Sequence, residues 1–253
     1  RQDDARKAWW TSDVEKIPGQ RYGFKLFDGT EWSAPLPDPR STSQPDGVHG
    51  LSKVTDTEFE WTDQHWTSYE LKGQVIYELH VGTFTEAGTF DGVVDKLDYL
   101  ADLGVTTIEL MPVQPFGGER NWGYDGVDWF AVQESYGGPE GLKRLVNAAH
   151  SKGIGVYLDV VFNHFGPDGN YNGKFGPYTT AGTTGWGDVV NFSGADSDEV
   201  RAYVLDAVRR WLTEFHIDGL RLDAVHSYDD RNAYSIMEQI NLLADEILSL
   251  IHI

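Results

Sequence analysis

The strongest constraint on the fold is a fourfold alternation of short apolar runs with longer amphipathic segments, which begins near residue 74. The apolar runs occupy residues 75–80, 105–110, 154–162 and 217–223. Each has the length of a strand rather than of a helix. Strands that alternate with helices form a parallel sheet joined by crossover connections. Because the runs are apolar almost throughout, we expect the sheet to be covered on both faces.

The segments between these runs carry helical spacing. Apolar residues recur at three- and four-residue intervals over residues 90–100, and again after Pro139, which suits the first turn of a helix. Asp196 and Glu199 stand at the spacing of a capping box, so a third helix is expected to begin there. A fourth helix is expected from about Asp230.

Four such units fit the first half of a (β/α)8 TIM barrel, or one doubly wound sheet. A nucleotide-binding sheet would carry a Gly-x-Gly-x-x-Gly or Walker loop, and neither follows the first strand here. The predicted fold class is α/β, with barrel strands 1–4 and their helices in residues 74–247.

Residues 1–73 follow a different pattern, rich in Trp, Gly, Pro and Asp. Residues 20–26 alternate in a strand-like way, and a series of prolines then excludes a helix. We interpret residues 1–50 as the C-terminal part of a small all-β domain and residues 51–73 as a connector.

Charge and cysteine content exclude several classes of function. The 253-residue chain has 40 acidic and 20 basic residues, a formal net charge of −20, so it repels phosphate backbones and anionic lipid. We expect no nucleic-acid and no membrane partner. The absence of cysteine excludes disulfides and thiolate metal sites, and fits a cytoplasmic location.

Polar side chains collect where the predicted strands end. The first run ends with Glu78 and His80, the third contains Asp159 and continues into Asn163 and His164, and the fourth ends with Arg221, Asp223 and, shortly beyond, His226. Any one of these could be a satisfied core residue. Because the carboxyl ends of parallel strands meet at one end of a barrel, their joint occurrence favours a shared pocket.

Arg221 and Asp223 are two residues apart on a strand and therefore share a face. An adjacent arginine keeps a carboxylate ionised and oriented, which suits an anionic nucleophile or a cation stabiliser. A structural salt bridge is the alternative. No zinc-binding helix motif and no Gly-x-Ser-x-Gly elbow is present, so we expect no metal and no serine nucleophile.

Two loops add aromatic rings near these strand ends. Residues 121–127 include Trp122, Tyr124 and Asp125, and residues 164–191 include Trp186. Rings that stack on the C–H faces of sugars, beside carboxylates that bind hydroxyls, are typical of a carbohydrate site. Each ring could instead pack within its own loop.

These strand ends resemble those of the α-amylase superfamily of glycoside hydrolases. Residues 159–164 resemble its first signature and residues 219–223 its second. Within the superfamily, residues 38–50, 77–85, 122–127 and 220–226 resemble the maltooligosyltrehalose trehalohydrolase family, and the similarity extends over about residues 9–247. The resemblance implies that residues 1–50 belong to an immunoglobulin-like β-sandwich related to carbohydrate-binding modules.

For the reaction, the resemblance implies retaining hydrolysis of the α-1,4 bond next to a terminal trehalose, with release of trehalose. Asp223 would be the nucleophile, held ionised by Arg221, and no cofactor would be needed. The substrate would be maltooligosyl trehalose or another α-1,4-glucan oligosaccharide. The remaining site residues divide into substrate-binding residues (His164, His226, Tyr124, Trp122, Asp125) and supporting residues (Asp159, Asn163, His80, Glu78).

The sequence departs from the family pattern in three respects. His226 and Ser227 replace the Lys-His pair of typical amylases, which favours the trehalohydrolases, and the loop after the third strand is too short and acid-poor for a calcium-binding domain. The general acid Glu, expected after a fifth strand, is absent, and Glu238 in a predicted helix is no substitute. Without that acid we expect the 253-residue chain to be inactive.

Residues 248–253 match a translated sequencing adapter, so we expect a non-native tail and a parent frame that continues. A natural helix end that matches by chance is the alternative.

Two other interpretations stay open. One is an α-1,4-glucan branching or debranching enzyme, which shares the predicted N-terminal module and barrel. The other is a non-catalytic glycan-binding protein.

Overall fold

Four parallel strands form the central sheet of the protein. The computed structural model describes residues 12–251, with side chains through Leu248. The strands β3 (Ile76–Leu79), β4 (Thr107–Leu110), β5 (Gly155–Val160) and β8 (Gly219–Leu222) are hydrogen-bonded in the order in which they occur in the chain. A doubly wound sheet reverses its strand order, whereas a barrel adds each strand beside the last. The predicted strands and the α/β class are confirmed, with the geometry of the first four strands of a barrel.

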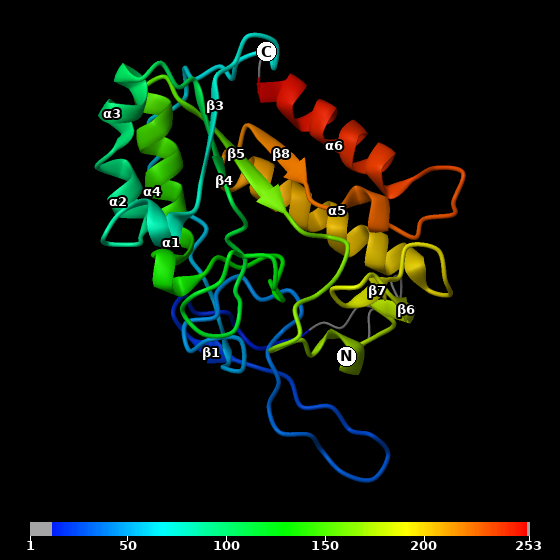
Figure 1. Ribbon diagram of the computed structural model, residues 1–253. Coiled ribbons are helices and arrows are strands. Elements are labelled where there is room, and N and C mark those ends of the chain that lie inside the picture. The colour runs from blue at the N-terminus through cyan, green and yellow to red at the C-terminus, as the bar shows by residue number, and fades with distance from the viewer. Residues whose placement is uncertain (1–11, 252–253) are drawn as a thin grey trace.

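Helices flank these strands (Figure 1). Three short helices follow β3: α1 (Val81–Phe84), α2 (Phe90–Val94) and α3 (Leu97–Asp102). The helix α4 (Gly138–Ser151) precedes β5, α5 (Ser197–Thr213) precedes β8, and α6 (Ile236–Ile251) comes last. Single turns of 3-10 helix lie at Glu134–Tyr136, Asn172–Lys174 and Val225–Ser227.

The core lies between the sheet and its helices. Strand residues Ile108, Leu110, Leu158 and Val160 are fully buried. Each long helix contributes an apolar stripe. Buried members of these stripes are Leu142, Leu145, Val146 and Ala149 on α4, Val204, Val208 and Trp211 on α5, and Ile236, Ile240 and Leu243 on α6. No helix within residues 12–251 is both long and apolar enough to cross a membrane.

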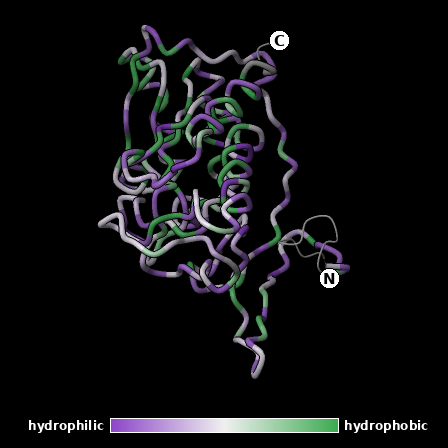
Figure 2. Tube along the Cα trace, turned by 90° about the vertical axis from the view of Figure 1, so that its right-hand side faces the viewer, coloured by the Kyte–Doolittle hydropathy of each residue, from purple (hydrophilic) through white to green (hydrophobic). Residues whose placement is uncertain are grey.

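Residues 12–73 contain little regular structure. β1 (Arg21–Tyr22) pairs antiparallel with β2 (Ser52–Lys53), and isolated bridges join Phe24 to Leu36 and Phe27 to Trp32. The hairpin closed by these bridges projects from the body in both views (Figures 1 and 2). The immunoglobulin-like sandwich and the domain boundaries stay predictions, and the first eleven residues lie outside the described part of the chain.

The predicted helix at residues 90–100 is two helices. Asp95 and Lys96 separate α2 from α3. The amide of Lys96 bonds to the carbonyl of Val93, a tighter i to i+3 contact that ends the first helix.

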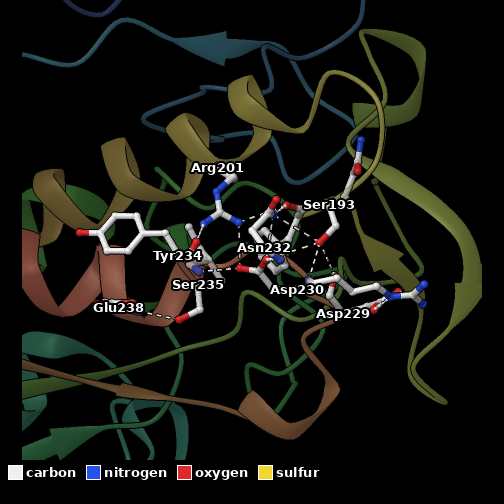
Figure 3. Close-up of polar contacts among 12 residues, drawn as sticks. Ser193, Arg201, Asp229, Asp230, Asn232, Tyr234, Ser235 and Glu238 are labelled. Atoms are coloured by element: carbon white, nitrogen blue, oxygen red, sulfur yellow. Dashed lines mark hydrogen bonds and ion pairs between the residues drawn. The ribbon is translucent and has the colours of Figure 1, made fainter.

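The third predicted helix begins where expected, at Ser197 directly after Asp196, but without the predicted capping box, and the predicted start of the last helix is wrong. Asp196 has a left-handed φ of 57° and makes no side-chain cap; the Asn191 side chain holds the preceding turn instead. The last helix begins at Ile236, not near Asp230. The Asp230 carboxylate accepts hydrogen bonds from the amides of Asn232 and Ile236, which bends residues 230–235 into a loop, and the Ser235 hydroxyl caps the amide of Glu238 (Figure 3).

A buried charge cluster joins the connector to the amino end of the sheet. His150 on α4 lies between two carboxylates, with Nδ1 2.8 Å from Asp63 and Nε2 2.9 Å from Asp218. His216 also contacts Asp63 at 2.8 Å, and the Trp66 indole donates to Asp218 at 2.7 Å. Both ring nitrogens of His150 face carboxylate oxygens, so any N–H that the ring carries has a carboxylate acceptor. This His150 cluster fixes residues 61–66 to the barrel.

We predict that His150→Gln destabilises the protein by roughly 3 kcal/mol, because a carboxamide offers one NH2 group in place of two ring nitrogens and loses the contact to Asp63 or to Asp218. Urea unfolding of the purified chain measures the change. His65→Gln is the matched control, since His65 lies on the same connector and is exposed. Equal unfolding midpoints for the two variants would contradict the assignment.

The cluster also predicts an acid-sensitive component of stability. Although burial opposes it, hydrogen bonds from His216 and His150 lower the pKa of Asp63 below its usual value. A lowered folded-state pKa contributes stability above the unfolded pKa of about 3.9, and this is lost as the pH falls through the folded pKa. The free energy of unfolding should therefore fall more steeply between pH 5 and 2.5 in the wild type than in Asp63→Asn. Parallel curves would contradict this.

Candidate functional site

An arginine bridges two carboxylates at the carboxyl ends of β5 and β8. Asp159 and Arg221 are register partners across the two strands. Nη1 of Arg221 donates to both oxygens of Asp159, at 3.1 and 2.9 Å, and to Oδ1 of Asp223 at 2.5 Å. Arg221 and Asp223 thus share one face of β8, as the two-residue spacing predicts.

Asp159 is the buried member of this group. Its exposed fraction is 0%, and the Tyr124 hydroxyl donates to its Oδ2 at 2.9 Å. Burial raises the pKa of Asp159 to about 6, against the lowering effects of the Tyr124 hydroxyl and the Arg221 guanidinium. A carboxylate fixed by two donors is suited to orienting Arg221 rather than to reacting.

Asp223 lies at the more open end of the bridge. Its amide bonds to the carbonyl of Val160 at 3.0 Å, which continues the β5–β8 pairing by one step. Ala224 then adopts a left-handed φ of 45°, so the chain turns away from the sheet immediately after Asp223. The side chain is 19% exposed. This turn leaves the carboxylate at the mouth of the strand ends, where a ligand can reach it.

Glu78, Glu109 and Asp159 form an acidic cluster on three adjacent strands. One oxygen from each lies within 4.8 Å of the others, and among the described residues this is the group whose donors could hold a metal ion. Burial and the Glu78 carboxylate raise the pKa of Glu109, while Arg221 lowers it. Arg221 therefore already supplies positive charge to the cluster.

The loop after β4 is shaped by its own polar residues. Asn121 donates to Oδ2 of Asp125 at 2.6 Å and accepts from the amide of Gly123 at 2.7 Å. Gly123 has a φ of 100° and lies against the backbone of Pro112, where a side chain would not fit. The turn directs Tyr124 to Asp159 and leaves Trp122 74% exposed.

His80, which directly follows β3, contacts the backbone of this loop. Its Nε2 lies 2.7 Å from the carbonyl of Asn121 and 3.1 Å from the hydroxyl of Tyr136, and its Nδ1 lies 3.1 Å from the Thr83 hydroxyl. These contacts join the end of β3 to the loop after β4, and the supporting role of His80 stays a prediction.

A hairpin after β5 brings a tryptophan to the site. Strands β6 (Thr179–Thr183) and β7 (Asp188–Val190) present Trp186 at their turn, 56% exposed. Its ring centroid lies 6.4 Å from that of His164 and 6.2 Å from that of His226. His164 is buried, which lowers its pKa, and its Nδ1 has no protein partner. Buried Asn163 likewise has no protein partner for its amide.

Sequence reasoning missed two residues of this region. Glu109 interrupts an apolar strand and is the register partner of Glu78, so its polarity was a usable signal. Tyr228 follows the 3-10 turn that carries His226; its buried hydroxyl has no protein partner, and burial with the charges of Asp223 and Asp159 raises its pKa. No spacing rule marks Tyr228.

Comparisons with known proteins agree with this geometry. The family profile described as "Alpha amylase, catalytic domain" matches residues 39–179. The chain is 52% identical over 248 residues to a malto-oligosyltrehalose trehalohydrolase of Rhizobium sp., covering 97% of this chain and 41% of the relative.

Two solved structures are also similar. A Salmonella typhimurium protein classed with the α-amylases has a TM-score of 0.79 and 43% identity, covering 85% of this chain and 38% of that one. An Anoxybacillus pullulanase complexed with maltotetraose has a TM-score of 0.77 and 26% identity, covering 91% and 39%. The chain spans about two fifths of the length of the curated relatives it matches.

We predict that Tyr124→Phe raises the pKa of Asp159 above its present value of about 6, because the lost hydrogen bond favours the ionised carboxylate. A carbon-13 NMR titration of the aspartate carboxyl groups measures the shift. Tyr69→Phe is the control, since the Tyr69 hydroxyl bonds to the carbonyl of Gly153. An unchanged Asp159 titration in Tyr124→Phe would contradict the prediction.

Proposed function

Because the chain belongs to the α-amylase family of glycoside hydrolases, we propose that it carries the nucleophile side of a retaining α-glucan hydrolase. One observation carries the proposal: Arg221 holds the carboxylates of Asp159 and Asp223 together at the strand ends. Such an arrangement keeps one carboxylate buried and fixed, and leaves the other accessible beside the guanidinium.

In the proposed reaction, Asp223 attacks the anomeric carbon of the bound glucan. The C–O bond to the leaving sugar breaks, a glycosyl ester forms on Asp223, and water then releases the sugar with its configuration retained. Arg221 orients the Asp223 carboxylate by its hydrogen bond to Oδ1. The leaving oxygen needs a proton from a carboxylic acid about 5–5.5 Å from the nucleophile. We expect that acid on the fifth strand of a complete barrel, and the four strands described here do not include it.

The side chains at these strand ends and in the two neighbouring loops are suited to a sugar ring. Trp122 and Trp186 expose large aromatic faces, and Tyr124 is fixed by its bond to Asp159. His164 and His226 flank Trp186 and would bind hydroxyls, with Asp125 in the neighbouring loop. Trehalohydrolases are about half identical to this chain, which favours maltooligosyl trehalose as substrate and trehalose as product.

A debranching activity is the second candidate. The pullulanase likeness, with maltotetraose in that protein's structure, favours it. Product analysis separates the two, because hydrolysis of maltooligosyl trehalose yields free trehalose and debranching of pullulan yields maltotriose units. Both reactions would use Asp223 and Arg221 in the same way.

We predict that Asp223→Asn lowers trehalose release by about 10⁴-fold or more, since the amide cannot form the glycosyl ester. The assay uses the protein expressed from its complete gene, with maltooligosyl trehalose as substrate. Asp229→Asn, in the same loop and with its side chain 46% exposed, is the control. A fluoro-sugar inhibitor should add its mass to the Asp223 peptide of the wild type. Labelling of a different carboxylate would overturn the assignment.

A further inference from the structure

A second arginine binds together the two segments behind the proposed site. Arg201 on α5 and Asp230 in the β8–α6 loop form an ion pair of 2.8 Å, with side chains only 8% and 5% exposed (Figure 3). Arg201 also donates to the carbonyls of Phe192 at 3.1 Å and Tyr234 at 2.7 Å. One guanidinium therefore satisfies three acceptors from segments before and after β8.

We call the Arg201–Asp230 ion pair and its hydrogen bonds the latch. Asp230 is its second charged residue. Besides Arg201, its carboxylate accepts from the amides of Asn232 and Ile236, at 3.1 and 2.5 Å. Asn232 in turn donates to the carbonyl of Phe192 at 2.8 Å, and the amide of Arg231 donates to the Ser193 hydroxyl at 2.7 Å. Residues 230–236 are thus fixed to residues 192–193 by side chains and backbone together.

The segment between the latch and β8 carries the proposed site residues. β8 ends at Leu222 and the latch begins at Asp230, so the intervening residues, which include His226, are held at both ends. Phe192, whose carbonyl the latch holds, packs its ring 5.4 Å from that of Tyr228. The contacts lead from Arg201 through Phe192 and Tyr228 to the turn that presents His226 beside Trp186.

We propose that Arg201 is a positioning residue that sets the place of His226 against the bound sugar, an inference that rests on the proposed function. Arg201 touches no substrate; it acts by fixing the far end of the segment. A displacement of about 1 Å in a substrate-positioning group can lower activity by up to about 100-fold. The inference therefore predicts a large kinetic effect from a residue behind the site.

A double-mutant cycle tests the proposal on the protein expressed from its complete gene. Arg201→Lys keeps the charge near Asp230 but loses the fork that binds the two carbonyls. We expect it to lower kcat/KM about 10-fold when His226 is present and less than 2-fold in the His226→Ala background. Arg231→Ala is the matched control, because Arg231 is in the same loop and its exposed side chain pairs with Asp229; it should leave kcat/KM unchanged.

A merely structural arginine gives a different result. Its replacement lowers the Tm, and the loss of kcat/KM measured well below the Tm is then absent or equal in both backgrounds. Either result would overturn the proposal. If Arg201→Lys does not fold, Asp230→Asn, which keeps the size of the side chain and weakens the ion pair, takes its place in the same cycle.

The cycle separates this inference from the proposed function. The wild type is first assayed for trehalose release, and then on pullulan; the product decides the proposed function. The coupling between Arg201 and His226 is measured on whichever glucan is hydrolysed. It is also measured from the Kd of maltotetraose, which needs no turnover. Additive effects of the two substitutions on both readouts would refute the positioning role even where trehalose is released.

Discussion

The strand-end site depends on one guanidinium, that of Arg221. Asp159 is buried, Asp223 lies two residues from Arg221, and Glu109 lies close enough for its pKa to respond to the same charge. Three carboxylates in one place repel each other, and burial alone would drive them toward the neutral form. An arginine cannot release its proton, so it is a permanent counter-charge. The parallel register of β5 and β8 brings Asp159 and Arg221 opposite each other, and thereby decides which carboxylate is fixed and which stays accessible.

The two ends of the barrel use buried charge differently. At the amino end, His150 is enclosed by Asp63 and Asp218, with Trp66 stacked on its ring at 4.6 Å, so every polar group has a protein partner. At the carboxyl end, Asn163, His164 and Tyr228 keep buried polar atoms without protein partners. Unsatisfied buried groups are costly, so a protein retains few of them. His164 and Tyr228 also lie close enough to Asp223 for their pKa values to respond to its charge, which favours a polar ligand there, whereas the His150 cluster serves stability.

The features that could be predicted from the sequence were those set by residues close together in the chain. The apolar runs and helical stripes gave the positions of the four strands, and the polar residues at three strand ends gave Asp159, Arg221 and Asp223. The His150 cluster could not be foreseen, because Asp63 and His150 are 87 residues apart and no periodicity relates them. Glu109 carried a signal, since a carboxylate in a buried strand needs a partner. The start of α6 was misplaced because Asp230 resembles an N-terminal cap in the sequence, whereas its side chain closes a loop and binds Arg201.

The same misplaced helix start explains how the loop after β8 can carry site residues. Had α6 begun at Asp230, the chain would have passed from Asp223 to a helix in six residues. Instead, the Asp230 carboxylate accepts hydrogen bonds from the amides of Asn232 and Ile236 and closes a loop. The loop continues to Ser235, whose hydroxyl caps α6. A longer loop costs conformational entropy unless its ends are held. Arg201 holds one end and the left-handed turn at Ala224 fixes the other. The loop can therefore leave regular structure, as a binding segment must, while its His226 stays beside Trp186.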